Sequence, residues 1–210
     1  MKGIYSRVLL VLVLMAGAGR AFSEEWNKLS PLEKEKLQKG EVIYKSVKTA
    51  DAEGKISGYG QSMAIIKSPI DKCWQIFTQF DKQAEYFPRK TVSQVIEQKP
   101  GFALVQKEFK FFGVRVRYVN QYKIDEKNYR IDFEMDKSKP HDIKDTAGFF
   151  LFEKLGSNQT LFVYGVTRTD TGIAMPGFVQ EYIAKRDLPA VAENVRKRIE
   201  SGGAWKKDSE

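Results

Sequence analysis

His141 is the only histidine of the 210-residue chain and the first residue to consider for chemistry. It lies in the polar segment 137–145, where Asp142 and Asp145 could orient it as a base or join it as metal ligands. A lone histidine in a charged loop is more often solvated, and we favour that interpretation. The sequence has no pair of histidines at helical spacing, no set of cysteine ligands, no glycine-rich phosphate loop and no Gly-x-Ser-x-Gly motif. It therefore predicts no metal site, no cofactor and no catalytic residue.

One carboxylate lies on a segment with the periodicity of a strand. Glu108 alternates with Leu104 and Gln106 and could point inward, where burial would raise its pKa and make it a general acid. Alternatively it points outward and pairs with Arg115 or Arg117 on the next strand. We favour the outward, paired position.

Cys73 is the only cysteine, so the chain cannot form an internal disulfide. Its neighbours Trp74 and Phe77 place it on the apolar face of a predicted helix, where packing is a more common role than reactivity. We therefore expect Cys73 to be buried and unreactive.

Hydrophobic periodicity predicts the elements that would position these residues. Segments 41–49 and 55–66 look extended, with a turn between them, and apolar residues at three- and four-residue spacing over 70–80 indicate a helix followed by a second short one. From Thr91 the apolar period changes to two, which predicts six strands, at 91–98, 102–110, 114–124, 129–135, 146–155 and 159–169. A long helix over 178–199 follows, and it is the only element long enough to cover one face of an antiparallel sheet.

The start of the chain has the features of a cleavable secretory signal. Lys2 and Arg7 precede the apolar run 8–15, which is too short for a membrane-spanning helix of about 20 residues. The small residues Ala21 and Ser23, at −3 and −1 of a cleavage site before Glu24, suit signal peptidase. We therefore assign 1–23 as a signal peptide and expect a periplasmic or secreted protein.

The remainder predicts one domain with two appendages. Residues 24–40 contain a capping box from Ser30 to Glu33 and form a short, charged helical arm outside the core. Residues 41–200 form the domain, and 201–210 form a flexible tail.

The charge is mildly basic. Removal of 1–23 takes away three basic residues and lowers the formal charge from +8 to +5. Basic and acidic residues interleave along the chain, without a basic run that carries interleaved aromatics. Nucleic acid is therefore not expected as a partner, whereas transient contact with an anionic membrane surface is compatible with the charge.

Several segments resemble a known family. Segment 64–81, in which a strand leads into Pro69 and Trp74, is similar to the opening of START-like domains, and 85–89, 148–154, 175–178 and 188–189 match later parts. The resemblance covers roughly 57–200 and is strongest to the coenzyme Q-binding, polyketide cyclase and lipid-transport branch. It implies an α+β helix-grip fold: a curved antiparallel sheet of about seven strands around a long C-terminal helix, with two short helices after the first core strand. It also implies a hydrophobic cavity between sheet and helix.

The aromatic side chains of the predicted sheet are candidates for the walls of that cavity, with a few polar groups to orient a ligand. The candidate ligand-binding residues are Tyr118, Asn120, Tyr122, Phe133, Phe149, Tyr164, Phe178 and Tyr182. We expect ligand entry between loops 137–146 and 169–177 and the start of the last helix.

Three functions follow from this organisation. The favoured one is an exported carrier of a hydrophobic small molecule such as a lipid, an isoprenoid quinone or a polyketide. The alternative is a cyclase or dehydratase with an inward acid such as Glu108. The third is a structural protein whose cavity is filled by its own side chains. An ionisable group of perturbed pKa in the cavity would favour the enzyme.

Overall fold

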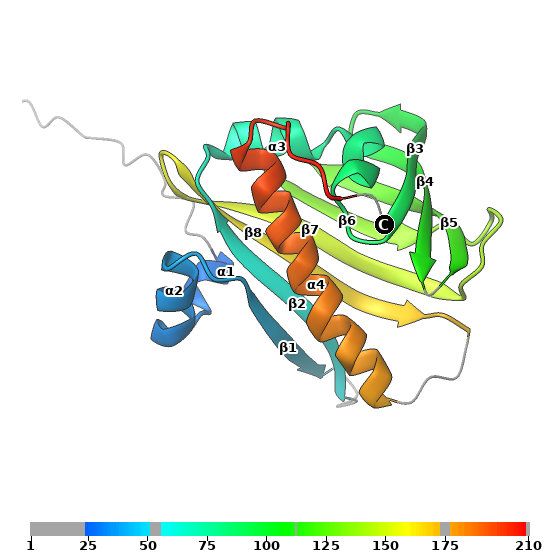
Figure 1. The fold of residues 1–210 in the computed structure, drawn as a ribbon, viewed down its shortest axis with the longest axis horizontal. Coiled ribbons are helices and arrows are strands. Elements are labelled where there is room, and N and C mark those ends of the chain that lie inside the picture. Colours follow the sequence, from blue (N-terminus) through cyan, green and yellow to red (C-terminus); the bar gives the residue numbers. More distant parts are fainter. Residues whose placement is uncertain (1–23, 51–55, 112, 173–176, 209–210) are drawn as a thin grey trace, which may run out of the picture.

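The fold of the protein is built on one antiparallel sheet. The computed structural model describes residues 24–50, 56–111, 113–172 and 177–208. Within these ranges it does not describe the side chains of 48–50, 56–59 and 177–184. Within these ranges eight strands pair in the order β1-β2-β8-β7-β6-β5-β4-β3 (Figure 1). They are β1 (Ile43–Ala50), β2 (Ile56–Ile66), β3 (Lys90–Lys99), β4 (Phe102–Phe111), β5 (Val114–Asp125), β6 (Arg130–Met135), β7 (Asp145–Gly156) and β8 (Gln159–Asp170). About seven strands were expected; β1 and β2 both join the sheet because they pair along the whole of β1.

The helices lie on both sides of this sheet. They are α1 (Glu24–Asn27), α2 (Pro31–Gln38), α3 (Ile70–Phe77), the 3-10 helix η1 (Phe80–Glu85) and α4 (Gly177–Glu200). In Figure 1, α4 runs diagonally across one face of the sheet, which we call the inner face, and the opposite side is the outer face. The two short helices α3 and η1 follow β2, as predicted. No helix among the described residues is long and apolar enough to cross a membrane.

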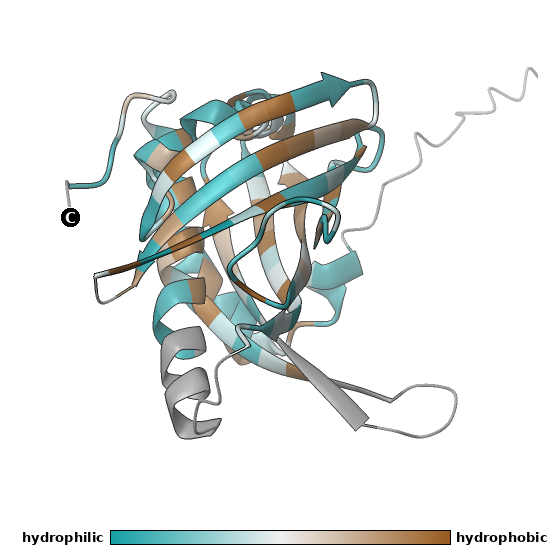
Figure 2. Ribbon diagram, turned by 90° about the vertical axis from the view of Figure 1, so that its right-hand side faces the viewer, coloured by the Kyte–Doolittle hydropathy of each residue, from teal (hydrophilic) through white to brown (hydrophobic). Residues whose placement is uncertain are grey.

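Strand alternation decides which side chains reach the inner face. In β6, Ile131, Phe133 and Met135 are buried, whereas Asp132 and Glu134 between them keep exposed surface. Apolar and polar segments alternate along the strands (Figure 2). Because successive side chains of a strand point to opposite faces, this pattern gives the sheet one face for α4 and one for solvent.

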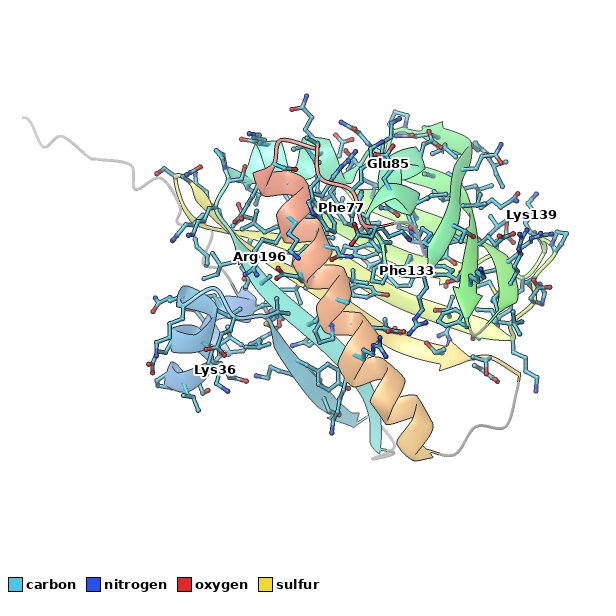
Figure 3. All side chains as sticks on the ribbon, in the orientation of Figure 1. Lys36, Phe77, Glu85, Phe133, Lys139 and Arg196 are labelled. Carbon is cyan, nitrogen blue, oxygen red and sulfur yellow. The ribbon has the colours of Figure 1, made fainter. Side chains whose placement is uncertain are left out.

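Aromatic rings fill the core under α4. The ring centroid of Phe150 lies 4.9 Å from that of Phe77, 5.2 Å from that of Phe133 and 5.0 Å from that of Tyr164. Figure 3 shows Phe77 and Phe133 in this interior, and Lys36 and Lys139 at the periphery. A hydrogen bond connects α4 to the sheet: the buried hydroxyl of Ser62 in β2 donates to the Leu188 carbonyl at 2.7 Å.

The N-terminal arm is part of a second core, on the outer face. The expected capping box is present, with the Ser30 N–H donating to Glu33 at 2.8 Å. Leu29 and Leu37 of the arm are buried against Met63 and other apolar residues of the outer face. The expectation that the arm lies outside the core is therefore wrong, because the outer face of β1, β2, β7 and β8 is apolar enough to need a cover.

Residues 201–208 are held against the domain, whereas a flexible tail was expected. Lys207 Nζ donates to the carbonyls of Phe87 and Lys90, both at 2.7 Å. The buried guanidinium of Arg198 donates to the Trp205 carbonyl at 2.9 Å and pairs with Glu85 at 3.0 Å. These contacts tie the end of the chain to η1 and the start of β3.

Candidate functional site

The inner face brings five of the predicted ligand-binding residues together: Tyr118, Asn120, Tyr122, Phe133 and Tyr164. The first three alternate along β5, and Tyr122 lies opposite Phe133 of β6 in the ladder. The ring centroid of Phe133 is 6.4 Å from that of Tyr122 and 6.3 Å from that of Tyr164. Ladder partners share one face of a sheet, so this grouping follows from strand register.

The other three predicted residues do not join this group. Phe149 lies on the outer face, where it packs with the apolar cluster of the arm and against Gly165. In β7, Phe150 and Phe152 point to the inner face. Successive residues of a strand point to opposite faces, so the prediction that Phe149 lines the inner face is wrong. The side chains of Phe178 and Tyr182 lie outside the described residues, as do residues 173–176 of the expected entry loop.

Accessibility divides the inner face into two parts. Asn120, Tyr122 and Phe133 are buried, with at most 6% of Phe133 exposed. By contrast, Phe109, Tyr118 and Tyr164 face inward and still keep exposed surface. The ring of Phe109 stacks on that of Tyr118 with centroids 5.8 Å apart. Phe109 of β4, Tyr118 of β5 and Tyr164 of β8 therefore form the accessible part of the inner face.

An ion pair from α4 marks the rim of this open part. Asp187 accepts from Arg89 Nε at 2.9 Å, and the Arg89 guanidinium lies 5.5 Å from the ring centroid of Phe111. Burial raises the pKa of Tyr118 and of Tyr164. Both phenols therefore keep their protons at neutral pH and can donate a hydrogen bond to a ligand.

Two buried lysines occupy the inner face, and sequence reasoning did not find them. Lys107 is the ladder partner of Tyr118, and its Nζ lies 4.8 Å from the Tyr122 ring centroid. Lys90 Nζ donates to Gln83 Oε1 at 2.9 Å and lies 3.9 Å from the ring centroid of Phe87. Within the described chain, neither amine has a carboxylate within ion-pair distance.

Burial changes the protonation of both amines. It lowers the pKa of Lys107 to about 7. It also lowers the pKa of Lys90 well below its usual value, with smaller contributions from the charges of Lys107 and Lys207. The signal for Lys107 was present in the sequence, because Val105 and Phe109 on its side of β4 are more apolar than the opposite series.

Several neutral polar groups beside these lysines have no partner among the described residues. They are both amide atoms of Asn120, the hydroxyls of Tyr86 and Tyr122, and Nε2 of Gln83. Buried polar groups in folded proteins are nearly always hydrogen-bonded, so such a set marks a place where a further molecule is expected.

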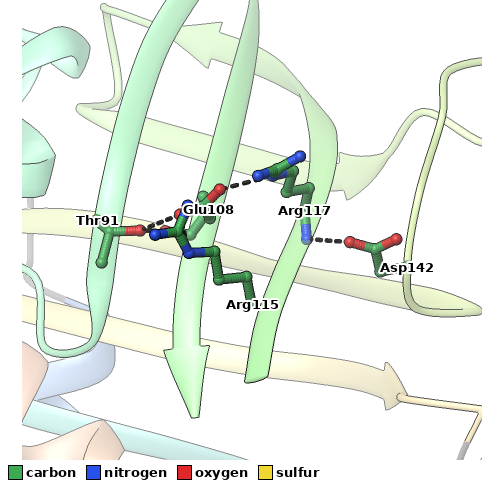
Figure 4. Close-up of polar contacts among 5 residues, drawn as sticks. All are labelled: Thr91, Glu108, Arg115, Arg117 and Asp142. Atoms are coloured by element: carbon green, nitrogen blue, oxygen red, sulfur yellow. Dashed lines mark hydrogen bonds and ion pairs between the residues drawn. The ribbon is translucent and has the colours of Figure 1, made fainter. Parts of the chain in front are cut away.

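Glu108 lies on the outer face, as favoured from the sequence, and is not an internal acid. Its carboxylate accepts from Arg117 Nε at 2.6 Å and from the Thr91 hydroxyl at 2.9 Å, and Arg115 is 3.8 Å away (Figure 4). The hydrogen bond from Arg117, followed by that from Thr91, lowers the pKa of Glu108. A carboxylate that is ionised at neutral pH cannot act as the acid of a dehydratase.

Within the part of the chain that the structure describes, His141 and Cys73, the other two residues considered for chemistry, do not lie in a site suited to catalysis or metal binding. His141 is exposed, and its Nδ1 lies 2.8 Å from the Lys139 carbonyl oxygen. Cys73 is buried, and burial raises the pKa of its thiol. No group of three or more His, Cys, Asp or Glu side chains in the described ranges is placed to hold a metal ion.

Two grooves open on the outer face. One, of about 200 Å³, is lined by residues that include Gln121, Asp132 and Phe149, and the other, of about 360 Å³, lies between the arm and the β1–β2 hairpin. Neither groove contains Tyr118, Tyr164 or the buried lysines. Of the five inner-face residues named above, Phe133 lines the first groove.

Solved structures share this fold. The chain is similar to a STAR-related lipid transfer protein from Xanthomonas axonopodis, at 10% identity and a TM-score of 0.57 over 73% of this chain and 98% of that one. A START superfamily protein from Mycobacterium smegmatis matches at 13% identity and 0.56, over 77% and 99%. The Zhui aromatase/cyclase from Streptomyces sp. R1128 matches at 16% and 0.53, over 77% and 99%.

These likenesses, at such low identity, concern the fold. No protein-family model matches the chain, and no curated protein matches it in sequence. The chain therefore shares the helix-grip fold of these structures, which is the fold that the resemblance seen in the sequence implied.

Proposed function

We propose that the protein is an exported carrier that holds a hydrophobic small molecule, such as a lipid, an isoprenoid quinone or a polyketide-like compound, between the inner face and α4. The observation that carries this proposal is the open aromatic surface formed by Phe109, Tyr118 and Tyr164. When a ligand covers aromatic surface that was in contact with water, the free energy of the complex falls, and this favours binding. The similar structures include a lipid transfer protein and an aromatase/cyclase, which supports the same class of ligand.

Replacing Tyr118 with alanine should weaken ligand binding about five- to tenfold. Roughly 50 Å² of ring covered by the ligand, at about 25 cal/mol per Å², contributes about 1 kcal/mol. Fluorescence titration with a fatty-acid or quinone probe measures the change. Lys123→Ala is the matched control, because Lys123 lies on the outer side of the same strand. Equal affinities of Tyr118→Ala and the unaltered protein would show that the ligand does not lie on this face.

A cyclase or dehydratase is the second candidate, and Lys107 is the observation that favours it. An amine whose pKa is lowered to about 7 is suited to transfer protons at neutral pH. Mass spectrometry of the ligand before and after long incubation with the protein separates the two functions. An unchanged ligand supports a carrier, whereas a ligand that loses water or gains a ring would replace the carrier with the enzyme.

The proposal places the carrier outside the cytoplasm, in the periplasm or the secreted fraction, with residues 1–23 removed. N-terminal sequencing of protein recovered from that fraction should return Glu24 as the first residue. Recovery of a chain that begins with Met1 would contradict export by cleavage. In this proposal the carrier meets an anionic membrane surface only transiently, while it loads or releases its ligand.

A further inference from the structure

Lys90 and Lys107 are two buried amines that have no carboxylate within ion-pair distance among the described residues. Lys90 is 1% exposed and Lys107 is 4% exposed. Two described carboxylates on the neighbouring elements have other partners, since Asp187 of α4 pairs with Arg89 and Glu85 of η1 pairs with Arg198. Burying a charged amine without a compensating charge is costly. Two such amines on one face therefore indicate a function other than packing of the core.

The neutral groups beside the amines add hydrogen-bond donors. Gln83 uses its Oε1 to accept from Lys90, which leaves its Nε2 without an acceptor among the described residues. The amide of Asn120 and the hydroxyl of Tyr122 are also unpaired there. The site is therefore rich in donors, and what it lacks is a ligand that accepts several hydrogen bonds at once.

The open aromatic surface leads directly to this set of donors. Tyr118 is the ladder partner of Lys107, and the ring centroid of Phe109 lies 5.5 Å from Lys90 Nζ. Phe109 and Tyr118 stack on each other and keep exposed surface. A molecule that covers these two rings with its apolar part would bring one end to the two amines.

We infer that the ligand is an amphipathic carboxylic acid, whose carboxylate lies between Lys90 and Lys107 and whose apolar part covers Phe109 and Tyr118. The inference rests on the proposed carrier function and narrows its ligand class. A carboxylate has a single charge and two acceptor oxygens, so it is cheaper to desolvate than a phosphate and offers one oxygen to each amine. A neutral quinone or sterol would leave both amines without a counter-charge.

The test compares an acid with its neutral analogue on the same protein. Dodecanoate and dodecanol compete against the fluorescent probe N-phenyl-1-naphthylamine, which is itself uncharged. We expect dodecanoate to bind roughly tenfold or more tightly than dodecanol, because charge-assisted hydrogen bonds are about twice as strong as neutral ones. Lys107→Met and Lys90→Met should each reduce this preference. Lys110→Met, an exposed lysine on the same strand as Lys107, should keep the full preference.

Each outcome bears on one of the two proposals. Equal affinity of the unaltered protein for dodecanoate and dodecanol would overturn the carboxylate site and leave the carrier function standing. Failure of the probe and of both competitors to bind would overturn the carrier function itself. A preference for dodecanoate that survives both lysine substitutions would also overturn the inference. The comparison on the unaltered protein decides the question even where a variant folds poorly.

Discussion

Phe150→Ala should lower the free energy of unfolding by about 3–5 kcal/mol, the usual cost of removing a large aromatic ring from a packed core. Phe150 is 1% exposed, and its ring meets those of Phe77, Phe133 and Tyr164 with centroids within 5.2 Å. These neighbours come from α3, β6 and β8, so the cavity left by the substitution would be lined by separate elements that cannot all collapse into it. Urea unfolding followed by circular dichroism measures the change.

Phe102→Ala is the matched control for this substitution. Phe102 is a strand phenylalanine of the same sheet, but it keeps exposed surface at the start of β4. Its removal should cost about 1 kcal/mol or less, because less apolar area is returned to water. Equal losses for the two variants would mean that the cluster around Phe150 is not the centre of the core.

The stability of the protein should rise as the pH increases from about 7 towards 10. Lys107 has a pKa of about 7 in the folded protein and an ordinary lysine value of 10.5 when unfolded. Between these values the unfolded chain binds a proton that the folded protein does not, and stability therefore increases with pH, by at most about 1.4 kcal/mol per pH unit for one group. Below pH 7 both states hold the proton and this gain is absent.

Other titrating groups near Lys107 limit the pH range over which this rise in stability can be measured. The lowered pKa of Lys90 acts in the same direction as that of Lys107, and Lys207 contributes to lowering it. Burial raises the pKa of Tyr118 and Tyr122, so above about pH 10 the unfolded chain loses protons that the folded protein keeps, and the trend reverses. Unfolding curves at intervals between pH 6.5 and 9.5 avoid that reversal.

Lys107→Met should make this profile less steep, with the contribution of Lys90 remaining. It should also stabilise the protein at pH 7 by about 1–4 kcal/mol, the range found when buried ion pairs are replaced by apolar residues of similar size. Lys110→Met, on the exposed side of the same strand, should keep the slope of the unaltered protein. A profile for the unaltered protein that is flat from pH 7 to 9.5 would show that Lys107 is hydrated in solution.

Much of the fold could be predicted because its signals are local. The period of two gave the six strands from β3 to β8 to within two residues, and the capping box at Ser30 placed the start of α2. The covering of the outer face by the arm could not be predicted in this way. It depends on β1, β2, β7 and β8 being neighbours, and β2 and β8 are far apart in the sequence.

The site was less predictable, because it depends on strand parity and on burial. In the run 149–152 all four residues are large and apolar, so the sequence does not say which parity faces α4, and Phe149 was assigned to the wrong face. Lys90 directly follows Arg89, which has a φ of 57°, and this local backbone turn directs the chain into β3. A lysine in such a position looks like a surface residue until the three-dimensional packing places it under Phe87 and Phe109.

The pairing of β2 with β8 has a consequence for the order in which the chain folds. Strands β3 to β8 form a meander in which each strand pairs with the next, so these hairpins can assemble locally. The β1–β2 hairpin is different, because β2 pairs with β8, with Gly60 opposite Val166. β8 is the last strand of the sheet to be synthesised. Closing a loop of on the order of 100 residues is entropically costly and slow. Until β8 arrives, the free edge of that hairpin can pair with another copy of the chain, and aggregation competes with folding at this step.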